Sequence, residues 1–345
     1  MSEVKYKSVP LEEAVGMMLG HDLTQIIPGE FKGPAFKKGH IIKQEDVSRL
    51  LDMGKRNIFV LDPKDGYVHE NEAAERIAKA ACGRGIRLTE PSEGRINFIS
   101  TRSGLLKISK EALLKINSVE DITFATIHGN HIVKPETGLA GTRIIPLATV
   151  EKNIKEVEHI CEEFYPVIDV KPFRSLKVGV ITTGSEVYSG RIKDKFGPVL
   201  KKKFAELNCE VMKQVFVPDD IEKTASVIHE LINDGAEFIA LTGGMSVDPD
   251  DQTPSSIRAA GAKVVTYGAP VYPGAMFMLG YVKDIPVVGL PGCVMYHRAS
   301  IFELVVPMIV AGEEVTKEYI SSLGHGGFCS SCKECRYPVC AFGKQ

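Results

Sequence analysis

The fold is decided by Leu176-Lys177-Val178-Gly179-Val180-Ile181-Thr182-Thr183-Gly184, an apolar run that ends in a polar turn. A short apolar run between turn signals is typical of a strand covered on both faces. Downstream, further strands are expected at 210–217, 237–241, 263–266 and 286–290, and helices at 197–207, 220–233, 253–260 and 295–310. Strands that alternate with crossover helices predict an α/β fold with a doubly wound, mostly parallel sheet over residues 173–315.

The rest of the chain divides around this domain. Residues 1–68 form an N-terminal segment with a helix expected over 44–53 and a strand over 57–61. Residues 69–172 are expected to form a smaller α+β region, with helices over 70–82, 110–116 and 150–164. Residues 322–345 form a tail rich in cysteine, which is expected to be separate from the sheet domain because the last core helix ends near residue 311.

Composition excludes several classes of protein. The chain has 345 residues, of which 44% are hydrophobic and 25% charged, as in ordinary globular domains. Its 42 Lys and Arg against 44 Asp and Glu give a net charge of −2, so no bulk field favours nucleic acid or a membrane surface. No secretory signal is visible, and the apolar stretch 301–311 is too short to span a bilayer. The expected location is the cytoplasm.

Three expected strands end in loops that could form one site. In an open parallel sheet, ligands bind beyond the carboxyl ends of the strands. Glycines there allow close approach of the backbone, and carboxylates beside an anion are reasonable where Mg²⁺ bridges them. The predicted ligand-binding residues are Thr183, Gly184, Ser185, Glu186, Gly243, Gly244, Met245, Ser246, Asp248, Pro291 and Gly292.

Five motifs in these loops resemble the molybdopterin-binding domain shared by MogA-type and MoeA-type proteins. They are 180–186 with Gly197-Pro198, the turn 218–220, the loop 242–251, Tyr272-Pro273-Gly274 and 289–292; segments 14–22 and 39–54 resemble MoeA-type N-terminal segments more weakly. The resemblance implies binding of molybdopterin or its adenylylated form, Mg²⁺ as cofactor, a homodimer, and molybdate and a recipient molybdoenzyme as partners. It also implies catalytic, Mg²⁺-linked roles for Asp194, Asp219 and Asp251.

The sequence departs from this family pattern at three points. The loop 273–276 lacks its Lys, Cys293-Val294 replaces Asn-Pro, and the β-barrel domain that follows in MoeA-type proteins is not expected. The leading hypothesis is a MoeA-like, Mg²⁺-dependent molybdenum insertase, a transferase of molybdenum cofactor biosynthesis. The alternatives are a non-catalytic molybdopterin carrier or sensor and a CinA-like nucleotide hydrolase. We interpret Cys293 and His297 as structural residues.

The tail carries four closely spaced cysteines, Cys329, Cys332, Cys335 and Cys340, in the pattern Cys-x2-Cys-x2-Cys-x4-Cys. In a reducing compartment such a cluster is typical of a metal site rather than a disulfide framework. Four thiolates could hold Zn²⁺ or an iron–sulfur cluster, with His325 as a further candidate ligand, and a redox-active thiol pair is the alternative. Truncation before Gly324 is expected to leave the sheet domain folded.

Overall fold

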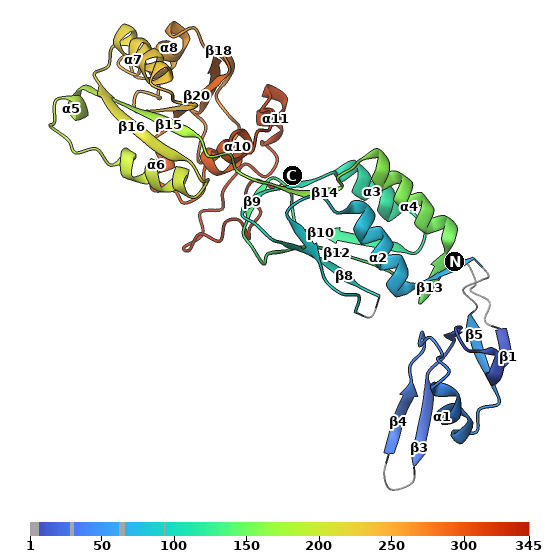
Figure 1. Cartoon of the computed structure of the whole chain (residues 1–345). Helices are drawn as coiled ribbons and strands as arrows, with labels where there is room; N and C mark the ends of the chain where they lie inside the picture. Colours follow the sequence, from blue (N-terminus) through green and yellow to red (C-terminus); the bar gives the residue numbers. More distant parts are fainter. Residues whose placement is uncertain (1–6, 28–30, 62–65, 93, 345) are drawn as a thin grey trace. The chain divides into compact units, whose positions relative to one another are not determined.

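The chain folds into two compact units, seen in the computed structural model of Figure 1, which describes residues 7–27, 31–61, 66–92 and 94–344. Unit 1 comprises residues 1–101, 108–127 and 135–169, and unit 2 comprises residues 102–107, 128–134 and 170–345. Parts of the predicted segment 1–68, namely residues 1–6, 28–30 and 62–65, lie outside the described residues. Within the described ranges, no helix combines the length and the apolar character needed to cross a membrane.

Unit 2 is built on a six-stranded sheet of order β16-β15-β17-β20-β19-β18. Its first four strands are parallel, and β18 and β19 run antiparallel to their neighbours. The predicted α/β class with a mostly parallel sheet is therefore confirmed. The strands are β15 (Lys177–Thr183), β16 (Glu210–Val217), β17 (Phe238–Thr242), β18 (Lys263–Tyr267), β19 (Met278–Val282) and β20 (Ile285–Leu290).

Helices cover both faces of this sheet (Figure 1). Val178, Val180 and Phe238 belong to a core shared with α6 (Phe196–Ala205) and α10 (Ile301–Val310). Ile181 and Ile239 belong to a second core shared with α7 (Ile221–Asn233) and α8 (Thr253–Ala259). Successive strand residues point to opposite faces, so an apolar run without interruption buries both. Unit 2 also contains the short helices α5 (Ser185–Tyr188) and α9 (Cys293–Tyr296).

The structure differs from the sequence expectations for unit 2 at two places. The sequence analysis missed strand β19, and the single helix expected over 295–310 was wrong, since this stretch forms two helices, α9 and α10. Ser300 starts α10 with a capping box: its Oγ accepts from the amide of Phe302 at 3.2 Å, and Glu303 Oε2 accepts from the Ser300 amide at 2.8 Å. This Ser-x-x-Glu signal is legible in the sequence.

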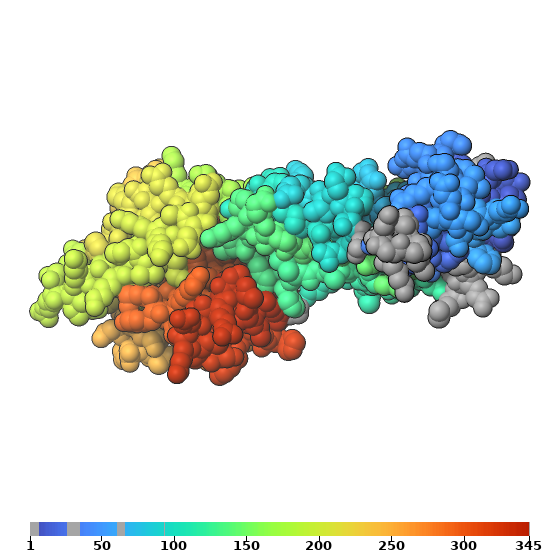
Figure 2. All heavy atoms as spheres, turned by 90° about the horizontal axis from the view of Figure 1, so that it is seen from below, coloured from blue at the N-terminus to red at the C-terminus, as the bar shows by residue number. Residues whose placement is uncertain are grey.

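The tail is part of the unit 2 core, contrary to the expectation that it is separate. After α11 (Lys317–Ser322), Tyr337 and Phe342 are 9% and 3% exposed and belong to the same core as Phe302 and Leu304 of α10. In Figure 2 the red C-terminal residues lie against the orange atoms that precede them in unit 2. Burial of two aromatic rings makes the tail a structural element of the sheet domain.

Unit 1 combines short sheets with helices. Its sheets have the orders β1-β5-β2, β10-β12-β8-β7, β3-β4 and β13-β6, and a further sheet, β11-β9-β14, includes the segments 102–107 and 128–134 assigned to unit 2. The strands are β1 (Lys7–Pro10), β2 (Met18–Leu19), β3 (Leu23–Ile27), β4 (Phe31–Phe36), β5 (Asn57–Leu61), β6 (Tyr67–His69), β7 (Ile86–Leu88), β8 (Ile96–Ser100), β9 (Gly104–Ile108), β10 (Ile122–Thr126), β11 (His131–Val133), β12 (Gly138–Ile144), β13 (Ala148–Val150) and β14 (Ile168–Lys171). The helices are the 3₁₀ turn η1 (Leu11–Glu13), α1 (Asp46–Asp52), α2 (Glu70–Ala81), α3 (Lys110–Ser118) and α4 (Glu151–Glu163).

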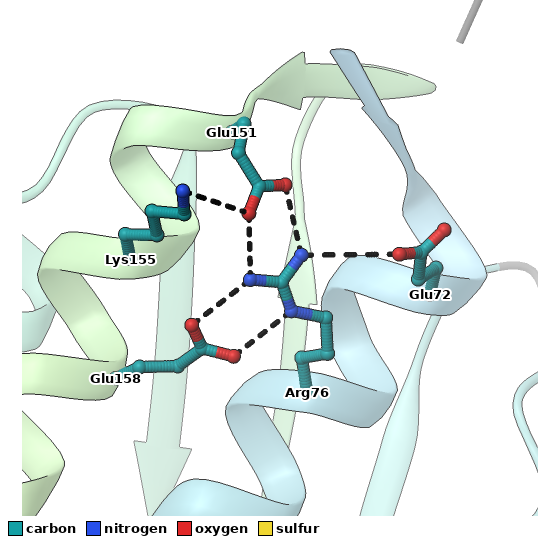
Figure 3. A network of polar contacts seen from close by, with 5 residues as sticks. All are labelled: Glu72, Arg76, Glu151, Lys155 and Glu158. Atoms are coloured by element: carbon teal, nitrogen blue, oxygen red, sulfur yellow. Dashed lines mark hydrogen bonds and ion pairs between the residues drawn. The ribbon is translucent and has the colours of Figure 1, made fainter. Parts of the chain in front are cut away.

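An arginine joins two helices of unit 1 (Figure 3). Arg76 of α2 donates two hydrogen bonds to each of two carboxylates of α4, Glu151 and Glu158, at 2.8–2.9 Å. These bonds raise the pKa of Arg76 and lower that of Glu151. Because the guanidinium is only partly exposed and its fork is filled on both sides, this network holds α2 and α4 in one register.

Candidate functional site

A pocket of about 510 Å³ lies beyond the carboxyl ends of β17 and β20 in unit 2. It is formed by the loop after β17, the loop before β19 and the turn that leads from β20 into α9. This is the edge where an open parallel sheet binds its ligands. The lining residues are Phe196, Gly243, Gly244, Met245, Ser246, Asp251, Tyr272, Pro273, Gly274, Ala275, Met276, Pro291, Gly292 and Cys293.

The loop after β17 needs glycine for two reasons. Gly243 and Gly244 have φ of +87° and +54°, a region that L-residues with side chains rarely adopt. A Cβ on Gly243 would also lie 2.3 Å from the main-chain oxygen of Thr183, at the end of β15. Thr253 fixes the loop from α8, since its Oγ1 donates to the Gly243 carbonyl at 2.8 Å and its amide donates to the Gly244 carbonyl at 3.1 Å. The loop backbone is therefore held rigidly at the pocket.

The opposite wall is the segment 272–276, which the sequence analysis matched to the family but did not name among the site residues. Tyr272 and Pro273 are joined by a cis peptide bond, and Gly274 has a φ of +141°. A Cβ on Gly274 would lie 2.5 Å from Cβ of Ile301, so only glycine lets the loop pack this closely on α10. The cue in the sequence was Pro-Gly before an apolar strand.

The structure brings together only part of the predicted ligand-binding set. Thr183 lies beneath the loop, where its hydroxyl is within hydrogen-bonding distance of Thr253 Oγ1 at 3.1 Å. The carboxylate of Glu186 approaches Gly184, with Oε1 3.0 Å from the position of a Cβ there. Of the predicted residues, those that line the pocket are Gly243, Gly244, Met245, Ser246, Asp251, Pro291 and Gly292; those that do not are Thr183, Gly184, Ser185, Glu186, Asp248, Asp194 and Asp219.

The three carboxylates predicted to be Mg²⁺-linked have different surroundings. Asp194 accepts from the amides of Phe196 and Gly197 at the start of α6 and from Gln214 Nε2 at 2.8 Å. Asp219 accepts from the amide and hydroxyl of Ser185 at 2.9 and 3.0 Å. Both therefore fix backbone at a helix start. Asp251 alone faces the pocket, and its Oδ2 accepts a hydrogen bond from the Asp248 amide at 3.0 Å.

The pocket offers backbone donors but little formal charge. Asp251 is the single charged residue among the described residues that line it. Among the described residues, the amides of Met245, Ser246 and Gly292, which line the pocket, donate no backbone hydrogen bond outside helices and strands. Burial raises the pKa of the Cys293 thiol, which keeps it protonated near neutrality and favours the structural interpretation of this residue.

The four tail cysteines are free thiols that line a second cavity of unit 2, of about 280 Å³. Cys332 and Cys335 are exposed, and Cys329 and Cys340 are half-buried against the core. Over residues 7–27, 31–61, 66–92 and 94–344, no group of three or more His, Cys, Asp or Glu side chains is placed to hold a single metal ion. His325, the further candidate, does not line this cavity.

Comparison with known proteins finds a family match for the sheet domain within unit 2. Residues 179–311 match the family described as "Probable molybdopterin binding domain". These residues, which are under half of the chain, are similar to the molybdopterin-binding domains of molybdenum cofactor biosynthesis proteins. Residues 8–62 match a separate family described as a domain of unknown function, DUF8806.

Three curated relatives show how far this similarity extends. A molybdopterin molybdenumtransferase of Haemophilus influenzae is 29% identical over 41% of this chain and 37% of its own length. A molybdopterin adenylyltransferase of Pyrococcus furiosus is 30% identical over 28% of this chain and 56% of its own length. A molybdopterin molybdenumtransferase of Staphylococcus epidermidis is 24% identical over 84% of this chain and 67% of its own length. The chain thus spans well under two thirds of the first two relatives.

Proposed function

We propose that the protein acts in molybdenum cofactor biosynthesis and binds molybdopterin, or its adenylylated form, in the pocket of unit 2. The family match of residues 179–311 supports the ligand class. The position of the binding site is supported by Gly243 and Gly244, which present backbone rather than side chains to the 510 Å³ pocket at the ligand-binding edge of the sheet.

The chemistry of the pocket fits the two ends of such a ligand. Phe196, Met245 and Tyr272 supply apolar and aromatic surface for a flat pterin ring. The amides of Ser246 and Gly292 supply donors for phosphate or other ligand oxygens. Apolar walls with a few convergent polar groups are the usual composition of a small-molecule site.

We infer that Asp251 holds Mg²⁺ together with oxygens of the substrate. Mg²⁺ is commonly bound through one or two carboxylates and substrate phosphates rather than by a complete protein cage, so one carboxylate in the pocket is sufficient. Bound there, Mg²⁺ would neutralise developing charge on a substrate oxygen. The proposed roles of Asp194 and Asp219 are then indirect, since both carboxylates hold helix amides near the site.

The activity we propose is that of a MoeA-like molybdenum insertase, with molybdate as second substrate, a homodimer as the working form and a molybdoenzyme as recipient. The resemblance of the motifs to MoeA-type proteins and the relative similar over 84% of the chain support this. A non-catalytic carrier or sensor with a metal or redox switch in the tail is the second candidate. It is favoured by the lack of Lys, Arg and His among the described residues of the pocket lining.

A pair of glycine variants tests the position of the site. Gly243→Ala places a Cβ 2.3 Å from the Thr183 oxygen, whereas Gly261→Ala has the same left-handed strain (φ +75°) and no atom within 4 Å. Titration of anaerobic molybdopterin should show at least tenfold weaker binding for Gly243→Ala and parental binding for Gly261→Ala. Ser246→Trp, at an exposed lining position, fills the pocket without disturbing the core. Parental affinity in both Gly243→Ala and Ser246→Trp would show that the ligand binds elsewhere.

A second pair tests Mg²⁺. Asp251→Asn keeps the hydrogen bond from Asp248 but removes a hard anionic ligand, so we expect molybdate insertion to fall and to recover partly at raised Mg²⁺. Asp250→Asn, an exposed neighbour that does not line the pocket, is the matched control. A loss that does not respond to Mg²⁺ would indicate a general base instead.

A further inference from the structure

The cysteine-bearing segment 329–340 is a loop closed at its base. The amide of Gly343 donates to the carbonyl of Gly326 at 2.9 Å, which joins the two ends of the loop. On the N-terminal side, the Cys329 amide donates to the Tyr272 carbonyl at 2.8 Å. On the C-terminal side, the buried ring of Phe342 anchors the loop in the core. A loop fixed in this way holds its side chains over one place on unit 2.

All four cysteines of the loop line the same cavity of about 280 Å³, with its other wall at 296–299 before α10. No disulfide joins them in the described chain. Four thiols within twelve residues line one cavity, and four cysteines are the number of protein ligands that an iron–sulfur cluster usually has.

The charged side chains that line this cavity are cationic. Arg298, Lys333 and Arg336 line it, and none of its described lining residues is Asp or Glu. Cationic side chains around the cavity complement a negatively charged group bound there.

The arrangement of the thiols distinguishes between metal centres. A mononuclear Zn²⁺ site needs four sulfur atoms about 2.3 Å from one point. The described residues contain no group of three or more Cys, His, Asp or Glu side chains placed to hold one ion, and the four cysteines are among the residues that line a space many times the volume of one ion. In an iron–sulfur cluster the cysteines are bound to different iron atoms, so they surround a volume rather than a point.

We propose that Cys329, Cys332, Cys335 and Cys340 bind an iron–sulfur cluster in this cavity. The cluster site belongs to unit 2 and shares a boundary with the proposed pterin pocket, since Tyr272 lines that pocket and its carbonyl accepts from the Cys329 amide. Loading of the cluster requires no bound pterin, so the metal content tests this proposal separately from the proposed function.

The test is elemental analysis of the full chain purified without oxygen, with acid-labile sulfide and visible absorption measured on the same sample. We expect iron and sulfide in equal amounts in the parent chain. Cys332→Ser with Cys335→Ser should lose both, and because these two residues are exposed, the core stays intact. Cys82→Ser, a half-buried cysteine of unit 1, is the control and should retain them. Zinc alone, neither metal, or iron retained in the double variant would each overturn the proposal.

Discussion

Substitution of Phe342 by Ala tests whether the tail is part of the unit 2 core. The ring is 3% exposed, its centroid is 6.2 Å from that of Tyr337, and both belong to the core that includes α10. Its neighbour Gly343 approaches Leu304 so closely that a Cβ there would lie 2.2 Å from Leu304 Cδ2. A site packed this tightly leaves little room for collapse, so most of the ring volume would become a cavity.

The expected loss of stability follows from the burial of the Phe342 ring. Replacement of a buried Phe by Ala costs about 3–5 kcal/mol. Since each 1.4 kcal/mol is tenfold in an equilibrium constant, amides that exchange by opening of unit 2 should exchange roughly two to four orders of magnitude faster. Native-state hydrogen exchange of peptides that cover β15 and β17 measures this opening in unit 2 alone.

The matched control is Phe328→Ala, which removes the same side chain from the same tail at a position that is 77% exposed. We expect this variant to change the free energy of opening by less than about 0.5 kcal/mol. Equal, small effects of the two substitutions on β15 and β17 would refute the assignment of the tail to the core. Truncation before Gly324 would then also leave the sheet stable.

Three further predictions concern other parts of the chain. Arg76→Met removes four charge-assisted hydrogen bonds to α4, so hydrogen exchange of α2 should show unit 1 destabilised by about 1–3 kcal/mol. The control Lys79→Met removes an exposed ion pair and should cost under about 0.5 kcal/mol; equal losses in the two variants would contradict this prediction. Burial lowers the pKa of His131 to about 4, so as pH falls below 6.5 the unfolded chain binds this proton before the folded chain does. The stability of the parent relative to His131→Leu should therefore drop by about 2 kcal/mol between pH 7 and 4.5. A stability difference between parent and variant that does not change with pH would contradict this prediction. Tyr272 lines the proposed pterin pocket and its carbonyl accepts from the Cys329 amide, so loss of the cluster should alter this wall of the pocket. If pterin binding is as proposed, a cluster-free chain carrying Cys332→Ser should bind molybdopterin at least about fivefold more weakly, and unchanged affinity would show that the two sites are uncoupled.

Local signals in the sequence predicted much of unit 2. The apolar runs that became β15 and β17 are legible because a strand buried on both faces needs uninterrupted apolar residues. The loop 242–246 was predicted as part of the site because paired glycines directly after such a strand let the backbone approach a ligand, and the structure places Gly243, Gly244, Met245 and Ser246 around the pocket. Strand and helix propensity, the spacing of apolar residues and the need for glycine in a turn all depend on residues that are neighbours in the chain, so they can be recognised from a single sequence.

Other features depend on residues that are distant in the chain. Asp219 binds the start of α5 through Ser185, 34 residues away, and the carboxylate of Asp194 is fixed by Gln214, so neither partner could be read from the motif that contains the acid. The tail was expected to be separate from the sheet domain because its cysteine spacing is a local pattern that shows no contact with other segments. Tyr337 and Phe342 fix the tail in the core by packing with residues of α10, and this contact could not be recognised from the tail sequence. The sequence by itself determined the strand and loop pattern of the sheet domain and named candidate residues for a ligand and for a metal. Only the tertiary structure decided which of them share a cavity, because burial and hydrogen bonding are set by contacts that form when distant segments pack together.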